Sequence, residues 1–304
     1  MTDFAAFLST LRPQVDEALD RLLPAAGTEP ASISEAMRYS VFAGGKRVRP
    51  ALVVMAGEAC GAPRSDLLAG GAAVEMVHTF SLVHDDLPAL DDDDLRRGRP
   101  TLHKARGEAM AVLAGDALLN HAFDVLATEP ASAPPQRRLQ AVALMARAVG
   151  TAGMIGGQVL DLEHEGAASR NGGRGREDAA RVLERIHRLK TGALIAASTR
   201  LGGIYAGAGS DRAKLLAGIG AELGLLFQIG DDILDVVGSS EQLGKTAGKD
   251  RQAEKLTYPH LFGVDGSRRK ARQAADRCLV LVEKLPAGRQ LFRSLVAFLV
   301  HRGS

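Results

Sequence analysis

Apolar residues recur at helical spacing along almost the whole chain. The clearest stripe consists of Leu216, Ile219, Leu223, Leu226, Ile233 and Val237. Steps of three and four residues place side chains on one face of a helix, whereas a strand would show strict alternation. Aromatic residues make up only 4% of the chain. The pattern therefore predicts an all-α protein.

Breaks in the helical pattern are short and rich in Gly, Pro or Ser. They fall at 23–30, 61–64, 128–136, 166–176, 206–210 and 238–248. Ser32 and Glu35 have the spacing of a capping box at the start of the second helix, and one long helix is expected over 178–205. No Pro-rich linker separates two halves, so we expect residues 1–304 to form a single domain.

Composition excludes several function classes. Hydrophobic residues are 46% and charged residues 24%, as in a packed protein. The formal charge is +2, so no overall field attracts nucleic acid. Cys60 and Cys278 lie far apart, which excludes a disulfide framework. No apolar run reaches the roughly 18 residues of a spanning helix, and no secretion signal opens the chain. We expect a cytoplasmic protein without stable membrane insertion.

Two groups of aspartates follow long apolar segments. The first comprises Asp85, Asp86 and the run 91–94, and the second comprises Asp231, Asp232 and Asp235. Carboxylates this close raise one another's pKa unless a positive charge neutralises them. Asp93 and Asp94 fit a solvated loop, but the repetition of the pattern favours a binding role for the others.

Spacing suggests which carboxylates act together. Asp231 and Asp235 are four residues apart and share a helix face. Asp85 and Asp91 are six residues apart, about 240° out of register on a straight helix. Pro88 lies between them and would bend or end the helix, which would bring Asp91 back. Asp92, seven residues on, is nearly in phase with Asp85 and stays an alternative.

Ligands that are all oxygen favour hard cations, Mg²⁺ before Ca²⁺. The chain has no EF-hand loop, so a structural calcium site is disfavoured. Because Mg²⁺ shares its ligand sphere with phosphate oxygens, two aspartate groups suggest a diphosphate held by bridging metal ions.

Basic residues gather in short turns that contain glycine. Gly44–Pro50 carries Lys46, Arg47 and Arg49 at the entry to a helix, and Arg96 and Arg97 directly follow the first aspartate group. With His78 these cations fit a second anion site that needs no metal. The segment 238–246 fails as a P-loop, which leaves Lys245 as a single phosphate-seeking cation. The sequence contains no motif that is typical of an activated protein nucleophile.

In this order, the segments GGKRVRP, VHTFSLVHDDLPALDDDDLRRGRPT, LAGDALL, GGQVLDL, IHRLKTGALI, FQIGDDILDVVG and LGKTAGKD…EKLTYP resemble the trans-isoprenyl diphosphate synthases, most closely the bacterial farnesyl diphosphate synthases. The resemblance runs over nearly the whole chain. It implies a large all-α bundle of the isoprenoid synthase type around a deep central cavity, usually a homodimer. It also implies head-to-tail condensation, in which Mg²⁺ draws diphosphate from an allylic substrate and isopentenyl diphosphate attacks the carbocation.

The resemblance also assigns roles to individual residues. It implies three Mg²⁺ ions with diphosphate bound, replaceable by Mn²⁺, near Asp85, Asp86, Asp91, Asp231, Asp232 and Asp235. Allylic diphosphate ligands are Arg96, Lys190 and Lys245. Isopentenyl diphosphate ligands are Lys46, Arg49, His78 and Arg97. Thr191 and Gln228 flank the reacting carbons, and Asp161 supports the site.

Product length is expected to depend on Phe80 and Ser81, which precede Asp85 by five and four residues. An aromatic residue at Phe80 resembles synthases that stop at C15, so we expect farnesyl diphosphate from isopentenyl diphosphate with dimethylallyl and geranyl diphosphate. The alternatives are a C20 geranylgeranyl diphosphate synthase of the same family and a non-catalytic partner subunit. A terpene cyclase is disfavoured because both aspartate motifs and GGKRVRP are present.

Overall fold

The computed structural model describes residues 3–165, 176–237 and 256–302, and over these ranges it confirms the all-α class. Its elements are helices, apart from one antiparallel pair of two-residue strands. The contacts divide the chain into two compact units. The N-terminal unit consists of Ala5–Ala143 and Leu201–Gly207, and the C-terminal unit of Met1–Phe4, Leu144–Arg200 and Ala208–Ser304. A single domain over 1–304 stays a prediction.

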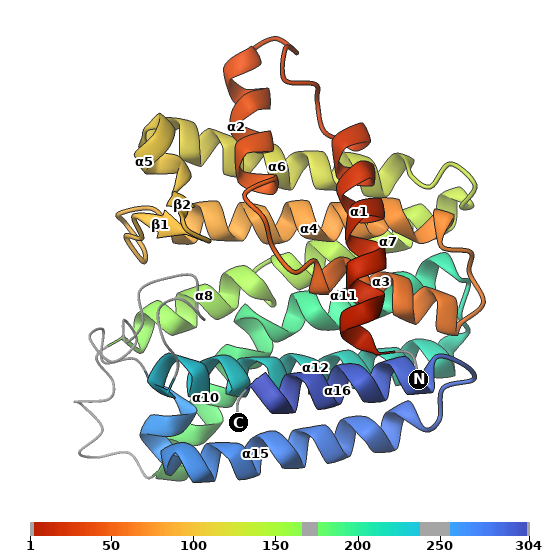
Figure 1. Cartoon of the computed structure of the whole chain (residues 1–304), viewed down its shortest axis with the longest axis vertical. Helices are drawn as coiled ribbons and strands as arrows, with labels where there is room; N and C mark the ends of the chain where they lie inside the picture. Colours follow the sequence, from red (N-terminus) through yellow and green to blue (C-terminus); the bar gives the residue numbers. More distant parts are fainter. Residues whose placement is uncertain (1–2, 166–175, 238–255, 303–304) are drawn as a thin grey trace. The chain divides into compact units, whose positions relative to one another are not determined.

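The N-terminal unit is built around two long helices that run side by side, α4 and α6 (Figure 1). Its elements in chain order are α1 (Phe4–Leu22), α2 (Ala31–Val41), α3 (Val48–Ala59), α4 (Ser65–Asp85), β1 (Leu95–Arg96), β2 (Arg99–Pro100), α5 (Leu102–Arg106), α6 (Glu108–Thr128) and most of α7 (Pro135–Val149). Helix α4 is buried on nearly every side, as expected for a helix that is apolar all round.

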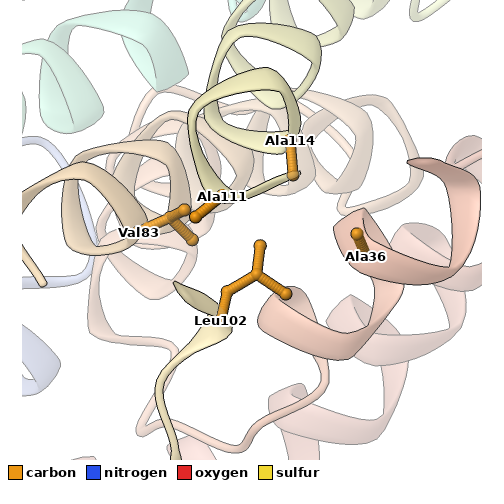
Figure 2. Packing of buried hydrophobic residues seen from close by; sticks show 5 residues of the cluster. All are labelled: Ala36, Val83, Leu102, Ala111 and Ala114. Atoms are coloured by element: carbon orange, nitrogen blue, oxygen red, sulfur yellow. The ribbon is translucent and has the colours of Figure 1, made fainter. Parts of the chain in front are cut away.

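A small apolar cluster fixes the last turn of α4. It consists of Ala36, Val83, Leu102, Ala111 and Ala114, from α2, α4, α5 and α6, and each is at most 5% exposed. Figure 2 shows the side chain of Leu102 between those of Val83 and Ala36. Because alanines line α6 here, the helices approach closely and the end of α4 is held firmly. The aspartates that follow therefore start from a rigid support.

The C-terminal unit contains α8 (Met154–Glu163), α10 (Arg176–Lys190), most of α11 (Gly192–Tyr205), α12 (Ser210–Val237), α15 (Tyr258–Val282) and α16 (Arg289–Arg302). Helices α12, α15 and α16 pack against one another, and α8 packs against α10 (Figure 1). The apolar stripe that begins at Leu216 lies on α12 and is buried from Leu216 through Ile233. This packing positions the second aspartate group at the end of α12.

Two local predictions are wrong. Helix α2 begins at Ala31 with Pro30 as N-cap, so Ser32 lies inside the first turn and caps nothing. The helix expected over 178–205 is interrupted at Thr191, where the amide of Thr191 reaches the carbonyl of His187 at 3.4 Å. Gly192 directly follows, and glycine lowers the local cost of such an interruption.

Four helical stretches in the described part are long and apolar enough to cross a membrane by length and composition: Ser65–Asp85, Glu108–Thr128, Pro135–Glu163 and Ser210–Val237. The apolar window of Ser65–Asp85 is 72% buried inside the protein. The absence of stable membrane insertion stays a prediction.

Candidate active-site residues

The first aspartate group forms a tight loop at the end of α4. Helix α4 ends at Asp85, and the amide of Asp91 donates to the carbonyl of Asp85 at 2.8 Å. The loop that contains Pro88 thus returns Asp91 to Asp85, as the predicted bend requires. Asp92 instead donates its amide to Leu87 at 3.2 Å, with a left-handed φ of 45°. The backbone of the loop therefore returns Asp91, rather than Asp92, to Asp85, and a shared metal ion stays a prediction.

Asp86 and Asp93 turn toward the protein interior and hold Arg96. The Nε of Arg96 donates to Asp86 Oδ1 at 2.9 Å, and its Nη2 lies 3.0 Å from Asp93 Oδ2. Both carboxylates are only 4% exposed, so Asp93 is not the solvated residue that the sequence suggests. Burial raises the pKa of Asp86, although Arg96 opposes the shift. Two buried carboxylates thereby orient Arg96 beside Asp85 and Asp91.

Arg97 rests on the glycine turn that precedes α3. Its Nη1 donates to the carbonyl of Gly44, and a Cβ added to Gly45 would lie 2.6 Å from the same nitrogen. Only glycine leaves room for the guanidinium here. The two segments predicted to bind isopentenyl diphosphate, GGKRVRP and Arg97, therefore meet within the N-terminal unit.

Cations converge on His78 in the same unit. Burial lowers the pKa of His78 well below its ordinary value, and Arg49 and Arg97 lower it further. Like charges brought together in this way repel one another unless an anion joins them. The positive field is what a diphosphate requires, and Lys46 adds an exposed cation in the adjoining turn.

Arg47 plays a different role from its neighbours. Its side chain is 2% exposed, and Nη1 donates to Glu75 Oε1 at 2.8 Å while Nε donates to Asp16 Oδ1 at 2.8 Å. Burial would lower the pKa of Arg47, but Glu75 and Asp16 raise it above its ordinary value. Arg47 is a buried structural ion, and nothing in the sequence distinguishes it from Lys46 and Arg49.

In the C-terminal unit, Lys190 lies where α10 ends. Its Nζ donates to Asp161 Oδ2 of α8 at 2.7 Å. The two helices approach closely, because a Cβ on Gly157 would lie 2.2 Å from the amide nitrogen of Lys190. Asp161 thus holds the Lys190 ammonium, in agreement with its expected supporting role.

A chain of hydrogen bonds links Thr191 to the start of α15. The Thr191 hydroxyl donates to Gln228 Oε1 at 2.7 Å, and Gln228 Nε2 donates to Asp232 Oδ1 at 3.2 Å. Asp232 Oδ2 accepts from the amide of Tyr258 at 3.0 Å. Both oxygens of Asp232 therefore bind the protein, so this carboxylate acts as an anchor in the structure. The predicted neighbours Thr191 and Gln228 do come together.

Asp231 and Asp235 lie one turn apart near the end of α12, as their spacing predicts. Asp231 is half-buried and Asp235 is 8% exposed. Lys245, the remaining predicted ligand of the allylic diphosphate, lies outside the described residues. The two aspartate groups belong to different units.

Two further residues of this unit, His187 and Tyr258, are not among the predicted site residues. The His187 ring stacks on that of Tyr258 with centroids 5.5 Å apart, and its Nε2 lies 3.6 Å from Asp232 Oδ2. Burial lowers the pKa of His187 from 6.5 to about 3. The only available signal was position, because His187 precedes Lys190 by one helical turn.

The pKa of His187 predicts a pH-dependent stability. The unfolded chain takes up a proton near pH 6.5, whereas the folded chain resists protonation down to about pH 3. Stability is therefore fully present above pH 6.5 and is lost as the pH falls toward 3. Between pH 6.5 and 5 we expect a loss of about 2 kcal/mol. Urea unfolding followed by circular dichroism measures it, and His187→Phe should lack this part of the slope. An identical slope in both proteins contradicts the prediction.

Comparison with known proteins agrees with this geometry. The model of the polyprenyl synthetase family matches residues 30–286. A relative from Arabidopsis thaliana, named heterodimeric geranylgeranyl pyrophosphate synthase large subunit 1, chloroplastic, is 48% identical over 91% of this chain and 74% of its own. The chloroplastic geranylgeranyl pyrophosphate synthase of Catharanthus roseus is 46% identical over 89% and 73%. The crystal structure of an FPP/GFPP synthase from Zymomonas mobilis superposes with a TM-score of 0.82, at 35% identity over 97% of this chain and 99% of its own.

These findings correct two expectations and settle the family. Because the plant relatives are named chloroplastic, the predicted cytoplasmic location is wrong. The relatives are named geranylgeranyl rather than farnesyl synthases, so the C15 product loses support. The family match covers most of the chain and agrees with the ordered motifs. This chain belongs to the polyprenyl synthetase family and is a prenyltransferase that elongates prenyl chains.

Proposed function

We propose that this protein condenses isopentenyl diphosphate with allylic diphosphates and releases geranylgeranyl diphosphate, the C20 product. The observation that carries the proposal is the bond from the Asp91 amide to the Asp85 carbonyl, which brings the backbones of two predicted metal ligands together at the end of α4. Carboxylate oxygens are the ligands that Mg²⁺ prefers, and the predicted metal ligands include no His or Cys. When bound, Mg²⁺ neutralises the charge of the departing diphosphate.

The chain's own residues divide the remaining work. Arg96 and Lys190, each oriented by carboxylates, bind the allylic diphosphate together with Lys245. Lys46, Arg49, Arg97 and the neutral His78 bind isopentenyl diphosphate. The Thr191 hydroxyl and the Gln228 carbonyl oxygen present dipoles that stabilise positive charge on the reacting carbons. Asp86 and Asp232 position Arg96 and Gln228 rather than bind metal. Three Mg²⁺ ions, replaceable by Mn²⁺, remain part of the proposal.

Product length follows from which side chains share the face of Asp85. On a helix, Ser81 lies about 40° from Asp85, whereas Phe80 lies about 140° away. The Phe80 ring contacts His84 edge-on with centroids 5.0 Å apart, and His84 abuts Gly115 of α6. A bulky side chain on the Asp85 face would stop a growing tail, and Ser81 is small. This supports C20 over C15, in agreement with the names of the plant relatives.

Two substitutions separate the roles of Phe80 and Ser81. We expect Ser81→Phe to shift the main product from C20 to C15, because the added ring extends from the Asp85 face. Phe80→Ala should leave C20 as the main product and lower stability by about 3 kcal/mol, since Phe80 is 7% exposed. Chromatography of the dephosphorylated products measures the product length of both variants. If Phe80→Ala lengthens the product and Ser81→Phe leaves it unchanged, Phe80 rather than Ser81 sets the product length and the argument from the Asp85 face is wrong.

A C15 product is the second candidate. The aromatic Phe80 favours it, and one solved structure similar to this chain is named an FPP/GFPP synthase. A C15 product requires the Phe80 ring to block the growing prenyl tail although this ring packs against His84.

The deciding experiment uses the full chain with labelled isopentenyl diphosphate, Mg²⁺ and dimethylallyl, geranyl or farnesyl diphosphate. The proposal expects a C20 alcohol from all three primers after dephosphorylation, abolished by EDTA. A C15 product that is not extended from farnesyl diphosphate would overturn the length assignment. No elongation by folded protein would overturn the activity and favour a non-catalytic partner subunit.

We also propose that the protein forms a homodimer. One relative is named the large subunit of a heterodimer, so a different partner is the competing outcome. Mass photometry of the purified chain at two concentrations distinguishes a homodimer from a monomer that awaits another subunit.

A further inference from the structure

Three potential metal ligands gather outside the predicted metal-binding residues. They are Asp92 and Asp94, which follow the loop of the first aspartate group, and His103 in α5. One ligand atom of each lies within 4.8 Å of the others. Both carboxylates are exposed, whereas His103 is only 6% exposed. The group lies entirely within the N-terminal unit.

Hydrogen bonding fixes the tautomer of His103. The Thr101 hydroxyl donates its single proton to the carbonyl of Asp93 at 2.7 Å. It must then accept from His103 Nδ1, which lies 3.1 Å away. Nδ1 therefore carries a ring proton, and in the neutral ring Nε2 carries a lone pair. Histidines that bind metals are held in this way, with the other ring nitrogen donating to a fixed acceptor.

The lone pair on Nε2 meets no hydrogen-bond donor in the described part of the chain. His103 Nε2 is buried and has no hydrogen-bond partner among the residues that the structure describes. A buried acceptor without a donor is costly and rare in native proteins. Two carboxylates nearby add further lone pairs and negative charge, which is the environment that a divalent cation stabilises.

Backbone hydrogen bonds hold together the segments that carry these ligands. Strands β1 and β2 pair as an antiparallel ladder, and the amide of Thr101 donates to the carbonyl of Asp94 at 3.0 Å. The segment carrying Asp94 is thereby tied to the start of α5, where His103 lies. Leu102, the residue before His103, is fixed in the apolar cluster of Figure 2.

We propose that Asp92, Asp94 and His103 form a second divalent-cation site, separate from Asp85 and Asp91. The imidazole ligand selects a borderline transition ion such as Mn²⁺ or Zn²⁺ over Mg²⁺, which prefers oxygen ligands alone. The bound ion links the loop after α4 to α5. This inference does not rest on the proposed function, because it concerns binding of metal in the absence of any substrate.

Lys104 competes for the same carboxylate. Its Nζ lies 2.8 Å from Asp94 Oδ1, and this contact raises the pKa of Lys104. Because the pair is exposed to solvent, it is readily exchanged for a metal ion. Lys104→Met should therefore tighten metal binding several-fold, whereas it would have no effect on an ion bound elsewhere.

Nitrogen coordination provides the direct test, because the predicted Asp85 and Asp91 ligands contain no nitrogen. Mn²⁺ is added to the metal-free full-length protein without substrate, and pulsed electron paramagnetic resonance records coupling to ¹⁴N. We expect a histidine signal that His103→Gln removes and that the control His121→Gln retains, since His121 is bonded to the carbonyl of Leu22. Asp92→Asn, at an exposed position, should weaken Zn²⁺ binding in calorimetry at least about 10-fold.

Each outcome has a definite meaning. Absence of nitrogen coupling in the parent protein, or its survival in His103→Gln, overturns the site. Unchanged Zn²⁺ affinity in both Asp92→Asn and Lys104→Met does so as well. If His103→Gln does not fold, the two exposed variants still decide, because neither removes a buried group.

Discussion

Asp85→Asn is expected to reduce kcat/KM for chain elongation at least about 1000-fold, with the fold intact. Charge stabilisation by a bound metal ion is worth several kcal/mol in the transition state, and each 1.36 kcal/mol is tenfold in rate. Asp85 is half-buried at the end of α4, beside Asp91. Asparagine keeps the shape but removes the charge that attracts Mg²⁺. The concentration of Mg²⁺ that gives half-maximal rate should also rise.

Asp66→Asn provides the matched control. Asp66 lies on the same helix, in its first turn, and is half-buried, and its Oδ1 accepts from the Ser132 hydroxyl at 3.1 Å, a bond that asparagine can keep. We expect the elongation rate of this variant to stay within about twofold of the parent, as for a conservative substitution away from the site. Steady-state kinetics with labelled isopentenyl diphosphate measures both variants. A loss below tenfold in Asp85→Asn, with unchanged circular dichroism, would remove Asp85 from the metal site.

Arg47→Ala is expected to cost about 3–5 kcal/mol of stability, because it leaves the carboxylate of Glu75 buried without its cation. Glu75 is 2% exposed and accepts from Arg47 at 2.8 Å. Arg47 also donates from Nη2 to the carbonyl of Val41 at 2.9 Å, so the substitution leaves this carbonyl oxygen without its hydrogen bond from Arg47 as well. The chain has no tryptophan, so urea unfolding is best followed by circular dichroism.

Two comparisons make the Arg47 prediction specific. Arg106→Ala breaks an exposed pair with Glu35, 3.2 Å apart, and should cost no more than about 1 kcal/mol. The double variant Arg47→Met/Glu75→Leu should recover much of the loss, because it removes both buried charges. If Arg47→Ala is as mild as Arg106→Ala, the buried pair is not a structural requirement.

The first aspartate group shows which features could be predicted from local sequence patterns and which could not. Pro88 predicts that the helix ends, and spacing alone leaves Asp91 and Asp92 as rivals. The choice depends on two loop hydrogen bonds, from Asp91 to Asp85 and from Asp92 to Leu87. These bonds depend on how the loop closes over α4, which periodicity does not encode.

Helical periodicity and residue chemistry were enough to predict the all-α class, the pairing of Asp231 with Asp235 on one helix face and the gathering of cations near glycine turns. These follow from the helical period and from residue chemistry, both of which are local. Long-range packing was needed to show that Arg47 is a buried ion, that Asp86 and Asp232 hold protein groups, and that His103 Nε2 is buried without a partner among the described residues. Burial and long-range partners decide the role of a charged side chain, because the same residue type is solvated, paired or ligating according to what packs around it.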